Sequence, residues 1–473
     1  MPPQEARGEE GALAAAALGL IEAIDIVARE TLLFAGIGFL VGGIDDLVID
    51  LLYGALMLKR RWTGSAPPLP PPPPARAPMA IFVPAWDEAG VIGPMLRAAL
   101  ARIDHGDYRL YVGTYPNDRA TIRAVVAVAA EDARVRLVIG SRDGPTTKAD
   151  CLNTLWRALL RDEARGWCPR AIVLHDAEDV VHRDELALFD RLIGPYDAVQ
   201  LPVLPLIDAG ARLVSGHYAD EFAEAHAKQL VVRGAIGAGL PLAGVGCAIA
   251  RPLLGTIAAG RPDGPFDAAS LTEDYELGLA IAAAGGRTAF PRVAASAGGI
   301  VAVRAYFPSR IDAAVRQKAR WMTGIALAGW DRIGWSRPLD WREHWMRMRD
   351  RRAPLAVIVL GAAYLGLVAW GLAALLRLVI GDGGGGAALP GWLIAVNALL
   401  LGWRLAVRAL FTGAAYGGRE ALWSVPRAFV GNLIALLAAR RAITRYVAQL
   451  AGVAPVWDKT AHQFPAHLPD TAP

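Results

Sequence analysis

Two acidic side chains, Asp176 and Glu178, closely follow a short apolar run at 171–174. Such a run is typical of a strand buried in a parallel sheet, and open α/β sheets bind ligands beyond the carboxyl ends of their strands. Carboxylate oxygens at that position suit Mg²⁺ or Mn²⁺, which favour sites shared with substrate phosphates. The pair is equally compatible with a solvated acidic turn that caps the next helix, and this stretch alone leaves both interpretations open.

Further polar side chains lie near predicted strand ends or helix starts. They are Asp87 and Glu88 after the run 80–84, Asp118 after 109–115, Lys148 in a loop that leads into a helix, Glu273 and Asp274 within 270–276, and Gln317, Arg320 and Trp321 on a predicted helix. Their order along the chain predicts a site for a nucleotide diphosphate-sugar.

Each of these residues also has a purely structural interpretation. Asp87 or Glu88 could cap the helix that starts near residue 89, and Asp118 could form an Asx turn. Ser270 and Glu273 have the spacing of a capping box. Gln317 and Trp321 share one helix face and could be ordinary packing residues.

The elements that must position these residues alternate along the chain. Strand-like runs occur at 80–84, 109–115, 135–140, 171–176 and 198–203, with helix-like stretches between them. This alternation predicts a mainly parallel sheet with helices on both faces. The first strand is not followed by Gly-x-Gly-x-x-Gly, and no Walker-type Gly-Lys-Ser/Thr occurs, so dinucleotide-binding and P-loop folds are disfavoured.

The composition predicts membrane segments beside a soluble domain. Hydrophobic residues make up 54% of the 473 residues and charged residues 20%, and the apolar stretches are unevenly distributed. The net charge of +4 gives no argument for a nucleic-acid partner. Three widely spaced cysteines form neither a disulfide framework nor a metal-ligand pattern, which favours a reducing compartment, and the acidic, polar start is unlike a cleaved signal peptide.

Four apolar stretches are candidates for membrane contact. Residues 31–57 are long enough to span a bilayer, although Asp45, Asp46 and Asp50 are costly there unless they face a partner helix or lie in the interface. Spans are also predicted at 353–380 and about 388–411, and 427–447 is interpreted as an interfacial amphipathic helix, with a third C-terminal span as the alternative. Basic clusters at 59–61 and 342–352 place the soluble domain on the cytoplasmic side.

These observations predict five regions. They are an N-terminal helix and membrane segment at 1–62, a Pro-rich linker at 63–78, an α/β domain at 79–335, a membrane region at 336–450 and an irregular tail at 451–473. The linker is interpreted as a semi-rigid tether rather than as a ligand for a proline-binding module.

Several phrases resemble those of membrane-bound family 2 glycosyltransferases, the group that includes cellulose and hyaluronan synthases. They are WDE at 86–88, YPND at 115–118, KADCLN at 148–153, DAED at 176–179, TEDYELG at 272–278 and QKARW at 317–321. More narrowly, FVPAWDEAGVIGPML, LHDAEDVVH and PVWDKTAHQFP resemble the phage adsorption protein B (NfrB-type) group. The resemblance covers about residues 38–465 and implies a GT-A domain, an α/β sheet that binds a nucleotide-sugar, with flanking transmembrane helices.

The resemblance also implies a role for each candidate residue. Asp87, Glu88 and Asp118 would contact the nucleobase and ribose, and Lys148 would lie near the nucleotide. Asp176 and Glu178 would bind Mg²⁺ or Mn²⁺, with Glu where the family usually has a second Asp, and Asp176 would also face the donor. Asp274 would be the general base, and Gln317, Arg320 and Trp321 would bind the diphosphate and the acceptor. Residues 244–251 would form an acceptor-side loop, and His175 and His182 are interpreted as orienting or loop residues rather than ligands.

The expected function is an inverting transfer of a sugar, with a UDP-sugar favoured by the resemblance, to a glycan or lipid acceptor in surface polysaccharide synthesis. The expected location is the bacterial inner membrane with the catalytic domain in the cytoplasm, and an outer-membrane export partner is a further expectation. Two alternatives remain. One is a catalytically weak GT-A scaffold subunit, suggested by Glu178; the other, a nucleotidyltransferase, is disfavoured by the QKARW helix.

Overall fold

The computed structural model describes residues 4–64, 69–296, 298–382, 384, 386, 388–453 and 459–468. Two compact units are present. One comprises Met1–Asp50 with Arg352–Val407, and the other comprises Leu51–Arg351 with Arg408–Pro473.

The second unit contains a seven-stranded sheet with the order β3-β2-β1-β4-β6-β5-β7. The strands are β1 (Met79–Pro84), β2 (Tyr108–Thr114), β3 (Val135–Ile139), β4 (Ala171–Leu174), β5 (Ala198–Gln200), β6 (Cys247–Ala250) and β7 (Thr288–Ala289). The β1–β2, β2–β3, β1–β4 and β5–β7 pairs are parallel, whereas β6 runs antiparallel between β4 and β5. The five predicted strands are therefore confirmed.

The expectation of a loop throughout 244–251 is wrong, because residues 247–250 form β6. Cys247, Ala248 and Ile249 are fully buried there. Their backbone pairs on both sides, with Leu174 to Ala171 of β4 and with Gln200 to Ala198 of β5. A four-residue strand without alternation gives little sequence signal.

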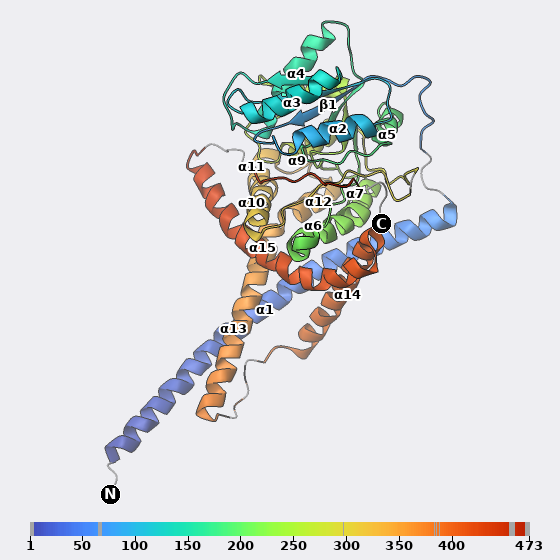
Figure 1. Ribbon diagram of the computed structural model, residues 1–473. Helices are drawn as coiled ribbons and strands as arrows, with labels where there is room; N and C mark the ends of the chain where they lie inside the picture. Colours follow the sequence, from blue (N-terminus) through green and yellow to red (C-terminus); the bar gives the residue numbers. More distant parts are fainter. Residues whose placement is uncertain are drawn as a thin grey trace. The chain divides into compact units, whose positions relative to one another are not determined.

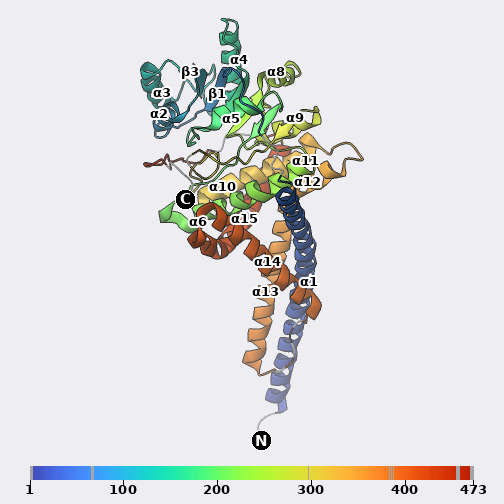
Figure 2. The same ribbon diagram turned by 90° about the vertical axis from the view of Figure 1, so that its right-hand side faces the viewer.

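Side chains alternate between the two faces of β1, and helices cover both faces. Ile81 and Val83 pack under α2 (Ile92–Arg102), α3 (Arg119–Glu131) and α5 (Glu185–Leu192). Ala80 and Phe82 pack under α4 (Lys148–Glu163), α8 (Arg251–Ala259) and α9 (Glu273–Ala283). Figure 2 shows α2 and α3 on one side of the sheet and α8 and α9 on the other.

A helical layer completes this unit. It consists of a 3₁₀ turn Ala209–Ala211, α6 (Arg212–Glu224), a π-helical turn Ala225–Gln229, α7 (Leu230–Ala235), α10 (Ile311–Trp321), a π-helical turn Met322–Leu327, α11 (Ala328–Ile333), α12 (Trp341–Arg351) and α15 (Gly418–Leu450). Figure 1 shows α10 and α15 side by side, and Ile434 and Ala438 of α15 are buried in clusters with Tyr218 of α6 and Ala319 of α10. The predicted helix at 427–447 therefore exists and is longer than expected.

The first unit is formed by helices. These are α13 (Ala353–Ile380), the larger part of α1 (Gln4–Thr63) and most of α14 (Gly391–Tyr416). Glycines allow close contact, since a Cβ at Gly38 would lie 2.5 Å from Val359; small residues at such contacts are typical of membrane helices. Among the described residues, α13, α14, α15 and Ala15–Thr63 of α1 are long and apolar enough to span a membrane.

The aspartates of α1 face partner helices, as one of the two sequence interpretations expected. Arg352 forms ion pairs of 2.6 Å with both Asp45 and Asp46, and the Trp403 indole donates to Asp50 at 2.8 Å. These pairs reduce the cost of placing acids in an apolar segment.

The described part of the Pro-rich stretch, residues 69–78, lies against the α/β domain. Leu69 packs on the core, and the Arg191 guanidinium donates to the Pro70 carbonyl at 2.7 and 2.9 Å. Residues 65–68 and 454–458 lie outside the described chain, whereas 459–468 are irregular, as predicted for the tail.

Candidate active site

A pocket of about 100 Å³ lies at the carboxyl ends of β1 and β4 and takes in residues from six separate parts of the sequence. It is lined by Pro84, Glu88, Thr147, Lys148, Asp176, Ala177, Glu178, Ser270, Leu271, Thr272, Glu273, Asp274, Gln317, Arg320, Trp321, Lys459, Thr460 and His462. Eight of the ten predicted site residues line it, and Asp87 and Asp118 do not.

Lys148 is the first residue of α4, whose N-cap Thr147 accepts the Asp150 N–H through its side chain. The Lys148 ammonium lies 2.6 Å from Oδ1 of Asp176 at the end of β4. Burial opposes the charged form of Lys148, but the carboxylates of Asp176, Glu273 and Asp274 outweigh it and raise the pKa of the lysine. The lysine therefore stays charged beside the acids.

A second group of ion pairs joins residues of the C-terminal tail to Glu88, which follows β1, and to Glu178, which follows β4. His462 Nδ1 lies 2.7 Å from Glu88 Oε1 and 3.2 Å from Glu178 Oε2, and Lys459 Nζ lies 3.1 Å from Glu88. Burial works against the imidazolium, yet Glu178 and Glu88 raise the pKa of His462 to about 10. Burial also raises the pKa of Glu88 and outweighs the opposite effect of His462.

Glu273 and Asp274 begin α9. The pKa of Glu273 is raised to about 7, first by burial and then by the charge of Asp274. Burial also raises the pKa of Asp274, while the charge of Lys148 opposes that rise. Two adjacent buried carboxylates with raised pKa values are typical of acid–base sites.

The capping-box interpretation of Ser270 and Glu273 is wrong in this structure. The helix N-cap is Thr272, which makes no side-chain cap hydrogen bond. The Ser270 hydroxyl instead donates to Glu276 at 2.6 Å and accepts the Thr272 N–H at 3.1 Å, which leaves Glu273 free to line the pocket.

Asp87 and Asp118 organise the loops beside the pocket. Asp118 caps α3 by accepting the Thr121 N–H at 3.1 Å, and its other oxygen accepts the Asp87 N–H at 2.6 Å. Asp87 itself has a φ of 55°. The helix-cap interpretation of Asp87 and Glu88 is wrong, since α2 begins at Ile92 after Val91, without a side-chain cap.

The α10 residues combine packing with exposure to the pocket. Trp321 lies 6.1 Å from the Tyr218 ring and 6.3 Å from Phe222 and Phe307, so it packs and also lines the pocket. Within the described residues, Gln317 Oε1 is buried without a hydrogen-bond partner. A buried acceptor of this kind is suited to a ligand hydroxyl.

Beneath the acidic loop, His175 lies between two carboxylates. Its ring nitrogens are 2.8 Å from Asp179 and 2.6 Å from Glu185, and all three side chains are buried. Asp179 also accepts the Asp176 N–H at 3.0 Å. The expectation that His175 orients the loop rather than binds a metal agrees with this geometry, and His182 accepts the Asp184 N–H in a turn.

The sequence of the chain is similar to those of known glycosyltransferases and phage adsorption proteins. Residues 74–324 match the family described as glycosyltransferase like family 2. The chain belongs to this family. It is 34% identical over 459 residues to bacteriophage adsorption protein B of Escherichia coli K12 and to bacteriophage N4 adsorption protein B of Escherichia coli O157:H7, covering 91% of this chain and 61% of each relative. This family 2 glycosyltransferase thus spans less than two thirds of those proteins.

The fold of the family 2 glycosyltransferase resembles that of a solved enzyme. The mannosyltransferase PcManGT from Pyrobaculum calidifontis, in complex with GDP-Man and Mn²⁺, matches with a TM-score of 0.51 at 18% identity, covering 89% of this chain and 99% of that one. The likeness supports the predicted GT-A fold.

The side-chain atoms that could bind a divalent cation in this glycosyltransferase fall into two groups. One ligand atom each from Glu88, Glu178 and His462 lie within 4.8 Å of one another. Glu178 Oε2 is buried without a hydrogen bond among the described residues, although His462 lies at ion-pair distance. Asp176, the other predicted ligand, pairs with Lys148. The two carboxylates suit Mn²⁺ or Mg²⁺, but the imidazole also suits other transition metals, so this set of ligands is less selective for Mn²⁺ or Mg²⁺ than an all-oxygen site would be.

Sequence reasoning missed the tail residues of the glycosyltransferase site. Lys459, Thr460 and His462 line the pocket, whereas the tail was predicted only to be irregular. The one available signal was the phrase PVWDKTAHQFP, which we used for the resemblance without assigning it a role. Its residues 455–458 lie outside the described chain.

Proposed function

We propose that this chain is a membrane-anchored, inverting glycosyltransferase that moves a sugar from a nucleotide-sugar to a glycan or lipid-linked acceptor in surface polysaccharide synthesis. UDP-sugars are the first donors to test. The observation that supports this most is the single pocket shared by Asp176, Glu178, Asp274, Gln317 and Arg320. Family membership supports the reaction class, and the pocket supports the assignment of residues.

The donor would lie between cationic groups and the acidic loop. A divalent cation at Glu178, with Asp176 or with Glu88 and His462, would neutralise charge on the diphosphate leaving group. Arg320 would add a planar donor pair suited to phosphate oxygens. Asp87 and Asp118 would shape the neighbouring loops on the nucleobase side, and Lys148 would face the nucleotide.

Asp274 would act as the general base. It takes the proton from an acceptor hydroxyl as the oxygen attacks the anomeric carbon, while the bond from that carbon to the diphosphate oxygen breaks. The nucleoside diphosphate leaves with the bonding electrons, and one displacement inverts the anomeric centre. Gln317 would accept from an acceptor hydroxyl, and the exposed side of Trp321 would contact a sugar face.

We also propose a place for the protein in the cell. The candidate spans and the Arg-rich segment 342–352 support an inner-membrane protein with a cytoplasmic catalytic domain. The phage adsorption relatives support a role in surface glycan synthesis, with an outer-membrane export partner as part of the same proposal.

The test is turnover by the detergent-solubilised full chain with a panel of nucleotide-sugars in Mn²⁺, Mg²⁺ or EDTA, with released nucleoside diphosphate as the readout. Metal-dependent release from one donor, absent in Asp274→Asn, supports the proposal. Folded protein that neither binds nor turns over any donor would instead favour the scaffold hypothesis.

A further inference from the structure

A second, larger cavity of about 520 Å³ is distinct from the catalytic pocket, since the two cavities have no lining residue in common. It is formed by α9, by α11 and the segment that follows it, by α12 and by the loop after α8. Four arginines and two carboxylates line it: Arg261, Arg332, Arg337, Arg347, Asp267 and Glu276. The lining is therefore net positive.

The arginines of the cavity differ in whether a carboxylate neutralises them. Arg332 is neutralised by Asp267 at 2.6 Å and Glu276 at 2.7 Å. Arg261 donates only to a carbonyl of its own loop, that of Pro265, and the exposed Arg337 guanidinium has no hydrogen-bond or ion-pair partner in the described part of the chain. These two side chains are the donors available to a ligand.

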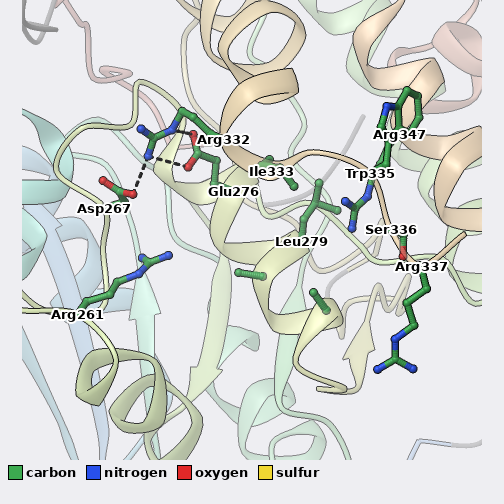
Figure 3. Close-up of a pocket in the computed structure, with 12 residues that line it drawn as sticks. Arg261, Asp267, Glu276, Leu279, Arg332, Ile333, Trp335, Ser336, Arg337 and Arg347 are labelled. Carbon is green, nitrogen blue, oxygen red and sulfur yellow. Dashed lines mark hydrogen bonds and ion pairs between the residues drawn. The ribbon is translucent and has the colours of Figure 1, made fainter.

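The floor of the cavity is apolar. Leu279 and Ile333 lie between the arginines, with Arg261 and Arg332 on one side and Arg337 and Arg347 on the other (Figure 3). Trp335 also lines the cavity and is 45% exposed. A cationic rim over an apolar floor suits an anionic amphiphile better than a fully hydrated anion.

The segment that forms this cavity leads into a membrane span. Trp341 begins α12, which ends at Arg351, and the candidate span α13 begins at Ala353. Leu339 is 94% exposed and Trp341 62% exposed, and tryptophan is enriched at membrane–water interfaces. Residues 332–352 contain seven arginines and three acids, a juxtamembrane composition that attracts anionic lipids.

We propose that this cavity binds the phosphate headgroup of an anionic phospholipid, with Arg337 as its ligand and Arg261 adding positive charge from the opposite side of the cavity. The site goes beyond sugar transfer and rests only on the proposed membrane anchoring. Glu276 also joins the cavity to the catalytic pocket, because it accepts the Ser270 hydroxyl and its N–H donates to the Thr272 carbonyl, and Ser270 and Thr272 both line that pocket.

The test measures lipid binding and needs no turnover. Native mass spectrometry of the detergent-solubilised full chain would count dioleoylphosphatidylglycerol adducts against dioleoylphosphatidylcholine as the zwitterionic control. We expect tighter binding of phosphatidylglycerol, weakened about five-fold by Arg337→Gln and about 25-fold by Arg261→Gln with Arg337→Gln, since one basic residue near an anionic surface contributes about 1 kcal/mol. Among the described residues Arg337→Gln breaks no side-chain hydrogen bond or ion pair, so we expect the variant to fold.

Arg342→Gln is the matched control. It removes the same charge from the same segment, but Arg342 donates to the Ile236 carbonyl and does not line the cavity. An equal loss in this control would overturn the proposal in favour of diffuse electrostatics. Equal binding of both lipids would also overturn it. Displacement of phosphatidylglycerol by millimolar inorganic phosphate would overturn it too, because it would show that the site binds soluble anions. Asp274→Asn should bind the lipid normally, which separates this proposal from the proposed reaction.

Discussion

The Lys148 ammonium and Oδ1 of Asp176 are 2.6 Å apart, so one ion pair joins the start of α4 to the end of β4. The two residues are 28 positions apart in the sequence, yet they meet because parallel strands and the helices between them bring loop ends to one edge of the sheet. Burial raises the pKa of Asp274, and the same ammonium opposes that rise. Lys148 therefore connects the donor side of the pocket with the assigned base.

Lys148→Met should lower kcat/KM about 10- to 100-fold at neutral pH, as expected for one charge-assisted contact of ~1.5–3 kcal/mol. It should also move the acid limb of the pH profile to higher pH. Without the cation, Asp274 holds its proton to a higher pH, and the base acts only when deprotonated. Lys148→Arg keeps the charge and should keep the limb in place; an unmoved limb in Lys148→Met would refute the electrostatic role.

Asp274→Asn and Glu273→Gln distinguish the two carboxylates at the start of α9. If Asp274 is the base, Asp274→Asn should reduce kcat by about 10²–10⁴-fold. Glu273→Gln should lose less activity and move the acid limb to lower pH, because the charge of Glu273 no longer raises the proton affinity of its neighbour. Single-turnover rates with saturating donor are the measurement, and the reverse ranking would assign the base to Glu273.

His175→Gln tests the support beneath the acidic loop. The imidazole lies between two buried carboxylates, and removing one partner of a buried ionic group typically costs about 3–5 kcal/mol. The pKa of His175 is raised to about 10, by Glu185 and Asp179 against the effect of burial. Its stabilisation is therefore complete below about pH 6.5 and is lost as the pH rises through about 10.

The measurement is thermal unfolding of the purified full chain between pH 6 and pH 10. The wild type should lose stability over this range, and His175→Gln should be less stable at pH 6 and show a smaller slope. His182→Gln is the matched control, since His182 lies in the same loop and, among the described residues, its ring is hydrogen-bonded to a backbone N–H and to no carboxylate. Equal effects of the two substitutions would count against a special role for His175.

The positions of five strands, and the grouping of most site residues at one edge of the sheet, were predictable from local sequence patterns. Apolar runs such as 171–174 end in acids, and the rule that ligands bind at strand ends brought Asp176 and Glu178 to the correct edge of the sheet. The short β6 strand was not predictable, because three buried residues and one half-buried residue, next to three glycine or valine positions, have no distinguishing period. Its burial depends on β4 and β5, which are distant in sequence.

The tail residues illustrate the other limit. Lys459 and His462 occur in an irregular stretch, where no helical or strand period indicates which side chain points inward. Their role depends on contacts across more than 280 positions, as in the pair of His462 with Glu178. Ser270 and Glu273 had the spacing of a capping box, but the Ser270 hydroxyl instead donates to Glu276, six positions further along the chain.

His462 could act as a metal ligand or as a counter-ion for the two glutamates, and substitution separates these roles. His462→Ala removes both functions, whereas His462→Lys keeps a positive charge but offers no neutral nitrogen to a metal. If His462 is a ligand, both variants should need at least about ten-fold more Mn²⁺ for half-maximal activity, a loss of ~1.4 kcal/mol or more. If it is a counter-ion, His462→Lys should behave like the wild type.

The measurement is a Mn²⁺ titration of turnover with the nucleotide-sugar, together with direct Mn²⁺ binding by electron paramagnetic resonance. Gln463→Ala is the control, because Gln463 is an exposed residue of the same segment that does not line the pocket. Unchanged Mn²⁺ dependence in His462→Ala would exclude both roles and assign cation binding to Asp176 and Glu178, the pair predicted from the sequence.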